Sequence, residues 1–448
     1  MKPAPDSQTP HPPGDARESS ALRDLVATLG PPTVAHRVFV ILLACTVAWG
    51  VCSYVYQMQH GLAVTAMNNY FSWGVYIINF VFFIGISMAG TLISAMLRLT
   101  GAEWRRPITR MAEGITLFAL LIAGPMIIID MGRPDRFLYV LFYGRFQSPI
   151  LWDVLSLTTY MTGSLIYLYL PMIPDLALLR DQPHFSRWRH VLYRTLALGW
   201  QDTHEQHRRL ERAISVMAVA IIPVAISIHT VTAWIFGMTL RPGWHSTIIG
   251  PDFVVGALYS GIAAVIIAMA LFRKFFHLHA YITPEHFRKL ATLLLVVGLA
   301  YLYFTVNNFI GSVYVTETEE TSLLSSIFSG SYAGQFWVMA IVGLVVPCVM
   351  LILPWTRSIG GIVTASVLVN IGMWLMRFII VVPTLSSPFV PPPSSTAPLN
   401  YFPTMVEWSI TAGGFAAFAL LYILFSKVFP IISIWEITAP AKAGGSAA

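Results

Sequence analysis

Ten long apolar runs, each close to the length of one membrane crossing, constrain this chain more than any other feature. About twenty apolar residues cross the hydrocarbon core of a bilayer as a helix, and a helix satisfies its own backbone groups there. The runs lie at about 37–56, 71–97, 111–131, 150–173, 213–236, 253–272, 288–310, 334–354, 360–382 and 407–429. The sequence therefore predicts an all-α polytopic membrane protein with about ten transmembrane helices.

Composition agrees with this fold class. Of the 448 residues, 56% are hydrophobic and 11% are charged, whereas a soluble domain is about 25% charged. The first apolar run follows a long polar head rich in proline and serine, which is not the pattern of a cleavable signal peptide. The net charge of +6 is ordinary for a protein whose cytoplasmic loops are basic. Nucleic acid is therefore not an expected partner.

Basic residues fall on alternate connections and predict an orientation. The connections after the second, fourth and sixth runs are rich in Arg and Lys, and the opposite set includes the acidic Thr316–Glu320. Since cytoplasmic loops hold the excess of Lys and Arg, we expect both termini in the cytoplasm. Arg133, Arg136 and Arg145 break the pattern in the connection after the third run. We expect an acidic partner or a ligand beside them.

Ionisable residues inside the predicted spans are few. A charge near the bilayer centre costs roughly 2.5–3.5 kcal/mol, so each such residue is a functional candidate. The predicted topology places them toward the outer half of the membrane: Asp130, Asp153, His229, Asp252, Arg377 and Glu407. We expect Arg377 to pair with a carboxylate such as Asp252 or Glu407, because an unpaired cation is costly there.

The two acids Asp130 and Asp153 flank the connection that carries the three arginines. One interpretation is structural, with helix-end carboxylates paired to arginines, and Asp153 fits it as a first-turn acid at a helix N-terminus. Asp130 fits it badly. It follows three isoleucines and ends a helix, where the dipole disfavours an anion. Both effects favour the protonated acid and make Asp130 a candidate proton donor or acceptor.

His229 lies within the fifth run, in "ISIHTVTAW". It is either a core histidine bonded to a neighbouring helix or a group that bonds a quinol hydroxyl or relays a proton. A second imidazole for a bis-histidine haem is not apparent in the runs. Cys45, Cys52 and Cys348 are scattered without a C-x-x-C motif, so we expect small core residues rather than metal ligands. No haem, iron–sulfur cluster or other redox metal is expected in this chain.

Two unrelated functions explain a cluster of ionisable groups near one membrane face. A secondary transporter would place its site at mid-membrane, with broken helices and access from both sides. A quinol-handling subunit would open an apolar slot with a few polar groups near one surface. The cluster on one side favours the second function.

Several motifs, in order, resemble the NrfD/PsrC family of quinone-interacting membrane subunits, and most closely the large membrane subunit of alternative complex III. They are "WGVYIINFVFFIGISMAGTLISA" (73–95), "DMGRPDRF" (130–137), "SPILWD" (148–153), "SIHTVTAW" (227–234), "NIGMWLMRFIIVV" (370–382) and "YFPTMVEW" (401–408). The resemblance covers about residues 35–430. The chain departs from many relatives at Asp252 and at Met376.

The resemblance implies a domain organisation. Residues 1–34 would be a disordered cytoplasmic tail, 35–60 a flanking helix, 61–240 a first four-helix bundle with the quinol site, and 241–382 a second four-helix bundle. A proline-rich outer loop (383–405) and a last helix with a cytoplasmic tail (406–448) would follow. We also expect the Trp- and Arg-rich stretch 182–212 to form an interfacial helix.

The resemblance also implies a function and roles for single residues. Menaquinol or ubiquinol would be oxidised near the periplasmic face, with Asp130 as proton acceptor and ligand contact. The other pocket residues would be Arg133, Trp152, Asp153 and His229, with catalytic roles for Asp153 and His229. A proton path would use Asp153, Asp252, Arg377 and Glu407. Electrons would pass to an extracytoplasmic iron–sulfur subunit and a multihaem cytochrome c subunit, beside a second homologous membrane subunit and lipid, in the bacterial cytoplasmic membrane. Proton translocation stays open as an addition to this function, and a quinone-reducing anchor of a sulfur- or nitrogen-compound reductase and a secondary transporter stay open as alternatives.

Overall fold

A computed structural model describes residues 22–183, 185–315, 317–387 and 400–438. Regular structure within these ranges is helical, and ten of the helices are long and apolar enough to cross a membrane. The prediction of an all-α polytopic membrane protein is confirmed. The parts of the predicted tails and outer loop at 1–21, 388–399 and 439–448 lie outside the described residues.

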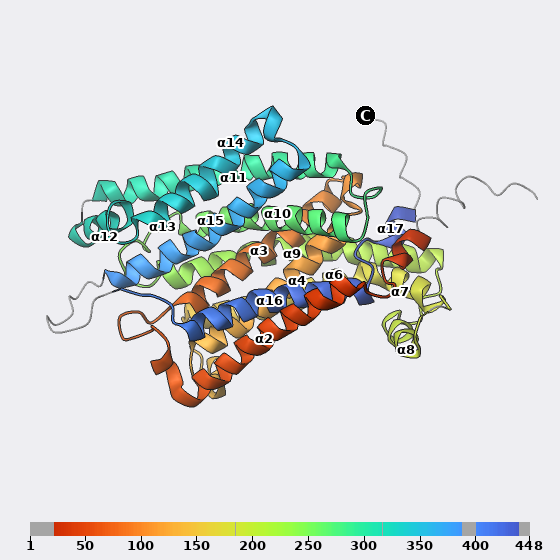
Figure 1. Cartoon of the computed structure of the whole chain (residues 1–448), viewed down its shortest axis with the longest axis horizontal. Coiled ribbons are helices and arrows are strands. Elements are labelled where there is room, and N and C mark those ends of the chain that lie inside the picture. The colour runs from red at the N-terminus through yellow and green to blue at the C-terminus, as the bar shows by residue number, and fades with distance from the viewer. Residues whose placement is uncertain (1–21, 184, 316, 388–399, 439–448) are drawn as a thin grey trace, which may run out of the picture.

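Four long helices pack together as the first bundle (Figure 1). They are α3 (Val75–Leu99), α4 (Thr109–Asp130), α6 (Pro149–Tyr169) and α9 (His204–Gly237). A flanking pair, α2 (Val34–His60) and α16 (Met405–Val428), runs along the outside of this bundle, and α16 contacts α3 and α4. The helix that ends at Asp130 therefore lies between the flanking pair and α6.

The second group of helices packs on α10 (Ile249–Phe275), which also contacts α3 and α9. The other members are α11 (Pro284–Val315), α15 (Ile359–Ser386) and a composite helix. The composite helix consists of α13 (Ala333–Trp337), the π-helical segment η5 (Val338–Val345) and α14 (Val346–Ile352). A Cβ at Gly343 would lie 2.3 Å from the Cα of Gly372. Glycine at both positions lets η5 and α15 cross in backbone contact.

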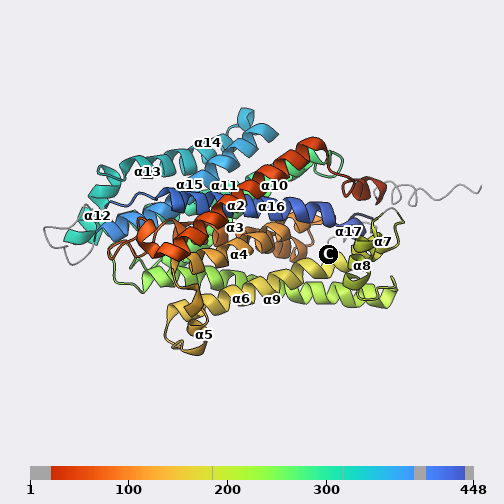
Figure 2. The ribbon, with the colours of Figure 1, turned by 60° about the horizontal axis from the view of Figure 1, so that its bottom comes forward.

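Short helices mark the two ends of the molecule (Figure 2). One end carries α7 (Ile173–Arg180), α8 (Arg187–Leu196) and α17 (Ile434–Thr438), and we call it the Arg-rich end. The opposite end carries α12 (Thr318–Phe328), and we call it the Asp130 end, since α4 finishes there. The short α5 (Tyr139–Phe142), in the connection after Asp130, projects sideways from the body of the molecule.

Buried ion pairs hold α17 against the Arg-rich end of the bundle. Asp175 is fully buried, forms an ion pair with Arg110 at 2.5 Å, and accepts the backbone N–H of Ile434 at 3.1 Å. Glu436 forms ion pairs with Arg98 and Arg105. Burial raises the pKa of Glu436, but the two guanidinium groups outweigh burial and hold the pKa below its usual value. These contacts close the bundle with the segment after α16.

The structure corrects three local expectations. The stretch 182–212 is not one helix: α8 ends at Leu196 and α9 begins at His204. Between them Leu198, Gly199 and Asp202 have positive φ, which breaks a right-handed helix, and Thr203 starts α9 with a capping box.

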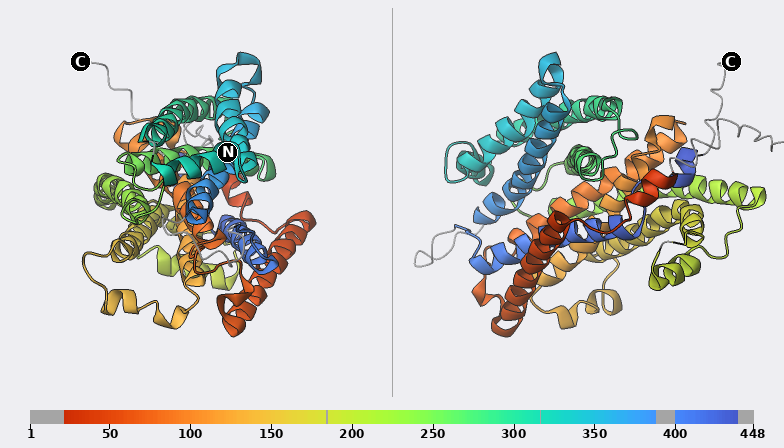
Figure 3. Two further views of the ribbon diagram at one scale, coloured as in Figure 1. Left: turned by 90° about the vertical axis from the view of Figure 1, so that its left-hand side faces the viewer. Right: turned by 45° about the vertical axis from the view of Figure 1, so that its right-hand side comes forward.

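Residues 22–27, expected in a disordered tail, are helical, and Leu25 and Leu29 are buried. Cys45 and Cys52 are exposed on α2 rather than in a core, because α2 contacts little besides α16. The flanking pair and the two groups of helices can be compared from two further sides in Figure 3.

Candidate functional site

Asp130 is the last residue of α4 and is buried, with 8% of its surface exposed. Its carboxyl group interacts with the backbone N–H of Gly74, at the start of α3, and is repelled by the carboxylate of Glu407. The Oδ1 atom has no hydrogen-bond partner within the described ranges. A buried acid with an unpartnered oxygen can accept a hydrogen bond or a proton from a ligand.

Two residues that the sequence did not single out fix the end of α4. Gln57 of α2 donates a hydrogen bond to the carbonyl oxygen of Ile129 at 3.2 Å. The hydroxyl of Tyr76, on α3, donates to Oε1 of Gln57 at 2.6 Å. Gln57 is one of two buried residues on α2. Nothing in the sequence marked Gln57, because its neighbours Ser53 and Gln59 are also polar and the residue that it contacts is 72 positions away in the chain.

Glu407, at the start of α16, is buried and fully hydrogen-bonded. Its carboxylate accepts the backbone N–H groups of Ala66 at 2.9 Å and Thr404 at 2.8 Å, and the hydroxyl of Tyr401 at 2.5 Å. The Tyr401 hydroxyl in turn accepts the backbone N–H of Val75 at 2.8 Å. Glu407 therefore ties the segment before α3 to the segment before α16, beside Asp130. The expected pairing of Glu407 with Arg377 is not found among the described residues.

Asp153, near the start of α6, is 2% exposed and contacts α9. The hydroxyl of Thr232 donates to its Oδ1 atom at 2.6 Å. One turn earlier on α9, the two ring nitrogens of His229 lie 2.7 Å from the carbonyl oxygen of Ala225 and 3.0 Å from that of Ile84. A neutral imidazole carries one N–H, so His229 can donate to both carbonyls only when it holds an extra proton.

Trp152 precedes Asp153 and lies at the rim of this site. Its indole N–H donates to the carbonyl oxygen of Phe146 at 2.5 Å. Its ring meets the ring of Trp234, on α9, edge to face at 6.4 Å between centroids. The two rings form an aromatic contact between α6 and α9 next to the Asp153 carboxylate.

The arginines of the connection after α4 do not neutralise the two buried acids. Arg133 pairs with Asp135 at 3.3 Å, and both side chains are more than half exposed. The hydrogen bond from Arg133 holds the pKa of Asp135 below its usual value. Within the described residues no ion pair joins an arginine to Asp130 or Asp153. The structural interpretation of these acids, as carboxylates paired to loop arginines, is therefore wrong for this structure.

Arg377 of α15 is buried without a direct ion pair in the described ranges. Its guanidinium lies 4.8 Å from the ring centroid of Phe253, on α10, and it attracts Asp252 electrostatically. Asp252 Oδ1, Arg377 Nη1 and the hydroxyl of Tyr301 all lack a hydrogen-bond partner in the described structure. The expected contact pair with Asp252 is thus a longer-range interaction, because the ring of Phe253 takes one face of the cation.

The structure divides the expected residues into separate groups. Asp130 and Glu407 lie beside α2, α3 and α16, whereas Asp153, Trp152 and His229 lie between α6 and α9. No recorded hydrogen bond or ion pair joins Asp130 to Asp153 in the described residues. Two cavities of the described structure, one between α9 and α10 and one beside α11, include neither acid in their lining.

Comparison with known proteins identifies the family of this chain. Residues 63–388 match the family described as polysulphide reductase, NrfD. A putative dimethyl sulfoxide reductase membrane subunit of Halobacterium salinarum is 27% identical over 447 residues, covering 96% of this chain and 98% of the relative. A subunit of the selenate reductase of Mesobacillus selenatarsenatis is 26% identical over 86% of this chain and 92% of the relative.

A third relative is the Hdr-like menaquinol oxidoreductase integral membrane subunit of Archaeoglobus fulgidus. It is 21% identical over 89% of this chain and 94% of its own length. The family match spans most of the ten-helix body, including α4, α6 and α9 with the acids and the histidine. The chain belongs to the NrfD family of membrane subunits of quinone-interacting oxidoreductase complexes.

Proposed function

We propose that this chain binds quinol at the Asp130 end of its first bundle and oxidises it for partner subunits. The observation that carries the proposal is the buried carboxyl group of Asp130, which has an unpartnered oxygen and no cation paired to it in the described structure. Burying an acid in this way is costly, so a structural role alone accounts for it poorly. A quinol hydroxyl is a donor of the kind that this oxygen lacks.

The chemistry of the reaction assigns roles to the other residues. Oxidation of a quinol to a quinone releases two electrons and two protons. Asp130 accepts the hydrogen bond and a proton from one hydroxyl and passes that proton to Asp153 with His229, the next proton station; the second proton follows the same route once Asp130 is free. Trp152 borders the ring, and Arg133 orients the connection after α4 through its contact with Asp135. A partner subunit would accept the two electrons.

The names of the relatives support the direction of electron flow. A reductase of dimethyl sulfoxide or selenate consumes electrons, so a membrane subunit that supplies them must oxidise a lipid-soluble carrier. The third relative is named as a menaquinol oxidoreductase subunit. We therefore favour quinol oxidation over quinone reduction and menaquinol as the first quinol to test. The finer assignment, to alternative complex III, rests on the sequence motifs.

We further propose an exit for protons through the polar residues at the junction of the two bundles. Asp252 and Arg377, with unpartnered polar atoms in the described structure, are suited to hold water between Asp153 and the second bundle. The donors around Glu407 support an anchoring role, in which its carboxyl group holds Tyr401 against the start of α3.

The proposed assembly follows from the same reaction. Because this chain is expected to hold no redox metal, its partners supply an extracytoplasmic iron–sulfur subunit and a multihaem cytochrome c subunit or a reductase. In the alternative complex III type, the membrane part also includes a second homologous membrane subunit. The Asp130 end would then face outward from a prokaryotic cytoplasmic membrane, with both termini inside.

The test is quinol oxidation by the purified complex in nanodiscs. We expect Asp130→Asn to lower menaquinol turnover by about 100-fold or more, the scale of a lost general base, while the make-up of the complex is unchanged. Asp181→Asn is the matched control, because Asp181 is an exposed aspartate at the Arg-rich end, away from the proposed site; it should oxidise menaquinol at the wild-type rate. Normal turnover by Asp130→Asn from pH 6 to pH 8 would refute the acceptor role.

A further inference from the structure

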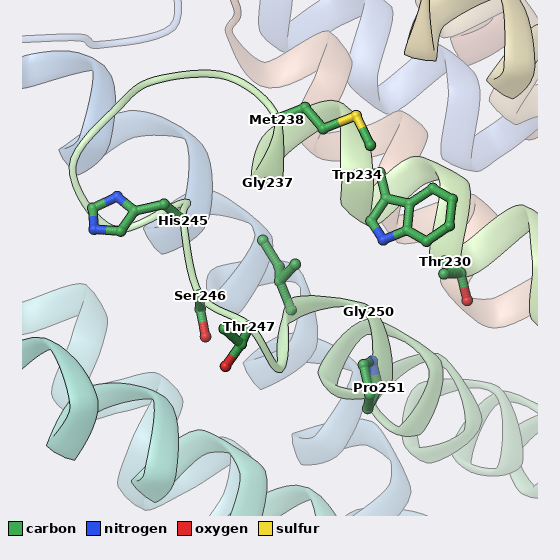
Figure 4. A pocket seen from close by; sticks show the side chains of 10 residues that line it. Thr230, Trp234, Gly237, Met238, His245, Ser246, Thr247, Gly250 and Pro251 are labelled. Atoms are coloured by element: carbon green, nitrogen blue, oxygen red, sulfur yellow. The ribbon is translucent and has the colours of Figure 1, made fainter. Parts of the chain in front are cut away.

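A cavity of about 340 Å³ lies between α9 and α10 at the Asp130 end (Figure 4). Its volume falls within the range of about 300–1,000 Å³ that is typical of small-molecule sites. Trp234 and Met238 of α9 lie on one side, and Ser246, Thr247 and Pro251 lie on the other. The cavity is separated from Asp153 by α9, since Thr232 contacts Asp153 from the opposite, buried face of that helix.

The connection that walls the cavity is held rigidly. Trp244 is 1% exposed, stacks on Trp73 at 5.5 Å between ring centroids, and donates its indole N–H to the carbonyl oxygen of Ile380 at 2.7 Å. Glu320 of α12 accepts the backbone N–H of Gly243 at 2.6 Å and lies 3.5 Å from His245. Two separate helices therefore fix this connection, and the cavity is built without a ligand.

Three polar side chains of the cavity are donors without partners in the described structure, whereas Thr230 donates to the carbonyl oxygen of Ile226 at 2.9 Å. The indole N–H of Trp234 and the hydroxyls of Ser246 and Thr247 make no recorded hydrogen bond to the described protein. The remaining wall combines the Trp234 ring, Met238, Ile249 and Pro251 with the polar residues Thr230 and His245. Such a wall fits a flat apolar ring whose carbonyl oxygens accept hydrogen bonds.

The charges around the cavity favour a neutral ligand. None of the residues that line it is Lys or Arg, the residues that bind phosphate groups. His245, its one titratable lining residue, is next to the carboxylate of Glu320. A phospholipid headgroup would lack its usual partners here. Trp234 and Met238 are both more than one-third exposed, so the cavity opens at the surface of the helix bundle, where a lipid-soluble molecule arrives from the bilayer.

We propose that this cavity is a second binding position for a quinone-class ring, on the other flank of α9 from Asp153. The inference rests on the proposed function for the class of ligand, which is a quinone. It adds a second binding position that the proposed oxidation of quinol at Asp130 does not use. The Trp152–Trp234 contact links the two positions: Trp152 adjoins the Asp153 site, and Trp234 lines the cavity.

Gly250 provides a precise test of the cavity. A Cβ at this position would lie 3.5 Å from Cγ2 of Thr230 and 4.0 Å from Nε1 of Trp234. Both distances are ordinary van der Waals contacts, so Gly250→Ala fits without displacement. The longer side chain of Gly250→Leu would extend into the space beside the Trp234 indole. Comparison of the two variants therefore distinguishes the effect of filling the cavity from the effect of any substitution at the start of α10.

The experiment is photolabelling of the purified complex in phosphatidylcholine nanodiscs with an azido derivative of a short-chain quinone. We expect labelled peptides within 230–251, a loss of about tenfold in that label for Gly250→Leu, and wild-type labelling for Gly250→Ala. A melting temperature equal to that of wild type for Gly250→Leu excludes misfolding. Mapping the label on the wild-type protein tests the site independently of any variant.

Three outcomes would overturn the inference. The first is quinone labelling confined to the region of Asp130 and Asp153, which leaves the proposed function intact. The second is labelling of 230–251 by a photoreactive phosphatidylcholine that excess quinone does not displace. The third is unchanged labelling of this segment in Gly250→Leu. Failure of the proposed function has a different signature, namely normal menaquinol oxidation by Asp130→Asn.

Discussion

The hydrogen bond between Thr232 and Asp153 allows the structural and chemical roles of Asp153 to be separated. Asp153→Asn keeps the shape of the side chain and an oxygen that can accept the Thr232 hydroxyl, which lies 2.6 Å from Oδ1 of the aspartate. It removes the ability to accept a proton. Thr232→Val does the reverse: it keeps the carboxyl group and removes the donor.

The expected magnitudes of the two changes differ. A hydrogen bond to a charged group contributes about 1.5–3 kcal/mol and one between neutral groups about 0.5–1.5 kcal/mol. Asp153→Asn should therefore destabilise the protein by about 1 kcal/mol or less, since one neutral bond remains. Thr232→Val leaves a buried carboxyl oxygen without its donor and should cost about 1–3 kcal/mol. For turnover the order is inverted, because a lost proton acceptor lowers the rate about 10²–10⁴-fold.

The assay combines thermal unfolding in detergent with menaquinol oxidation by the assembled complex in nanodiscs. We expect Thr232→Val to be the less stable variant and Asp153→Asn to be the slower enzyme. If Asp153 is only structural, both measurements should rank the variants in the same order. Turnover of Asp153→Asn within twofold of wild type, with Thr232→Val slower, would refute the proton-transfer role.

Three further predictions concern the contacts that hold the site and the Arg-rich end. Glu407→Gln should lower the unfolding free energy by about 1–3 kcal/mol, because an amide cannot accept all three of the donors on this carboxylate; a melting temperature equal to wild type would contradict this. Asp175→Asn should cost about 3–5 kcal/mol by leaving Arg110 buried without its counterion, whereas Glu103→Gln, at a half-exposed position, should change stability by less than about 0.5 kcal/mol. The folded-state pKa of Glu436 lies below its usual value of 4.5. The stabilisation that its carboxylate gives the folded protein is therefore fully present above pH 4.5 and is lost as the pH falls through that lowered pKa. The difference in melting temperature between wild type and Glu436→Gln should be constant from pH 8 to pH 5 and shrink only below pH 4.5.

The spans could be predicted from the sequence because the bilayer imposes one length and one polarity on each. All ten predicted runs correspond to helices of the structure. Their ends could not be predicted as well: α2 begins at Val34 and ends at His60, beyond the apolar core, because capping and tertiary contacts rather than hydropathy set the ends. The π-helical segment Val338–Val345 carries no signature in composition, since it has the same apolar residues as an α-helix.

The residues alone singled out only the ionisable members of the candidate site, and Trp152 was added by the family resemblance. Asp130, Asp153 and His229 stood out because charge is rare in a span. Their partners did not, because a hydroxyl such as Thr232, or a glutamine such as Gln57, is an ordinary residue until a distant helix brings it into contact. The expected ion pair of Arg377 failed for a related reason, because a sequence cannot show that the ring of Phe253 lies against the cation.

A density map of the complex purified with a bound quinone-site inhibitor would show directly whether quinol binds at the Asp130 end. We expect a ring at the Asp130 end of the first bundle, with a polar ring atom within hydrogen-bond distance of the Asp130 or Asp153 carboxyl group. An assembly with inhibitor density elsewhere, and with both carboxyl groups enclosed by protein side chains, would contradict it.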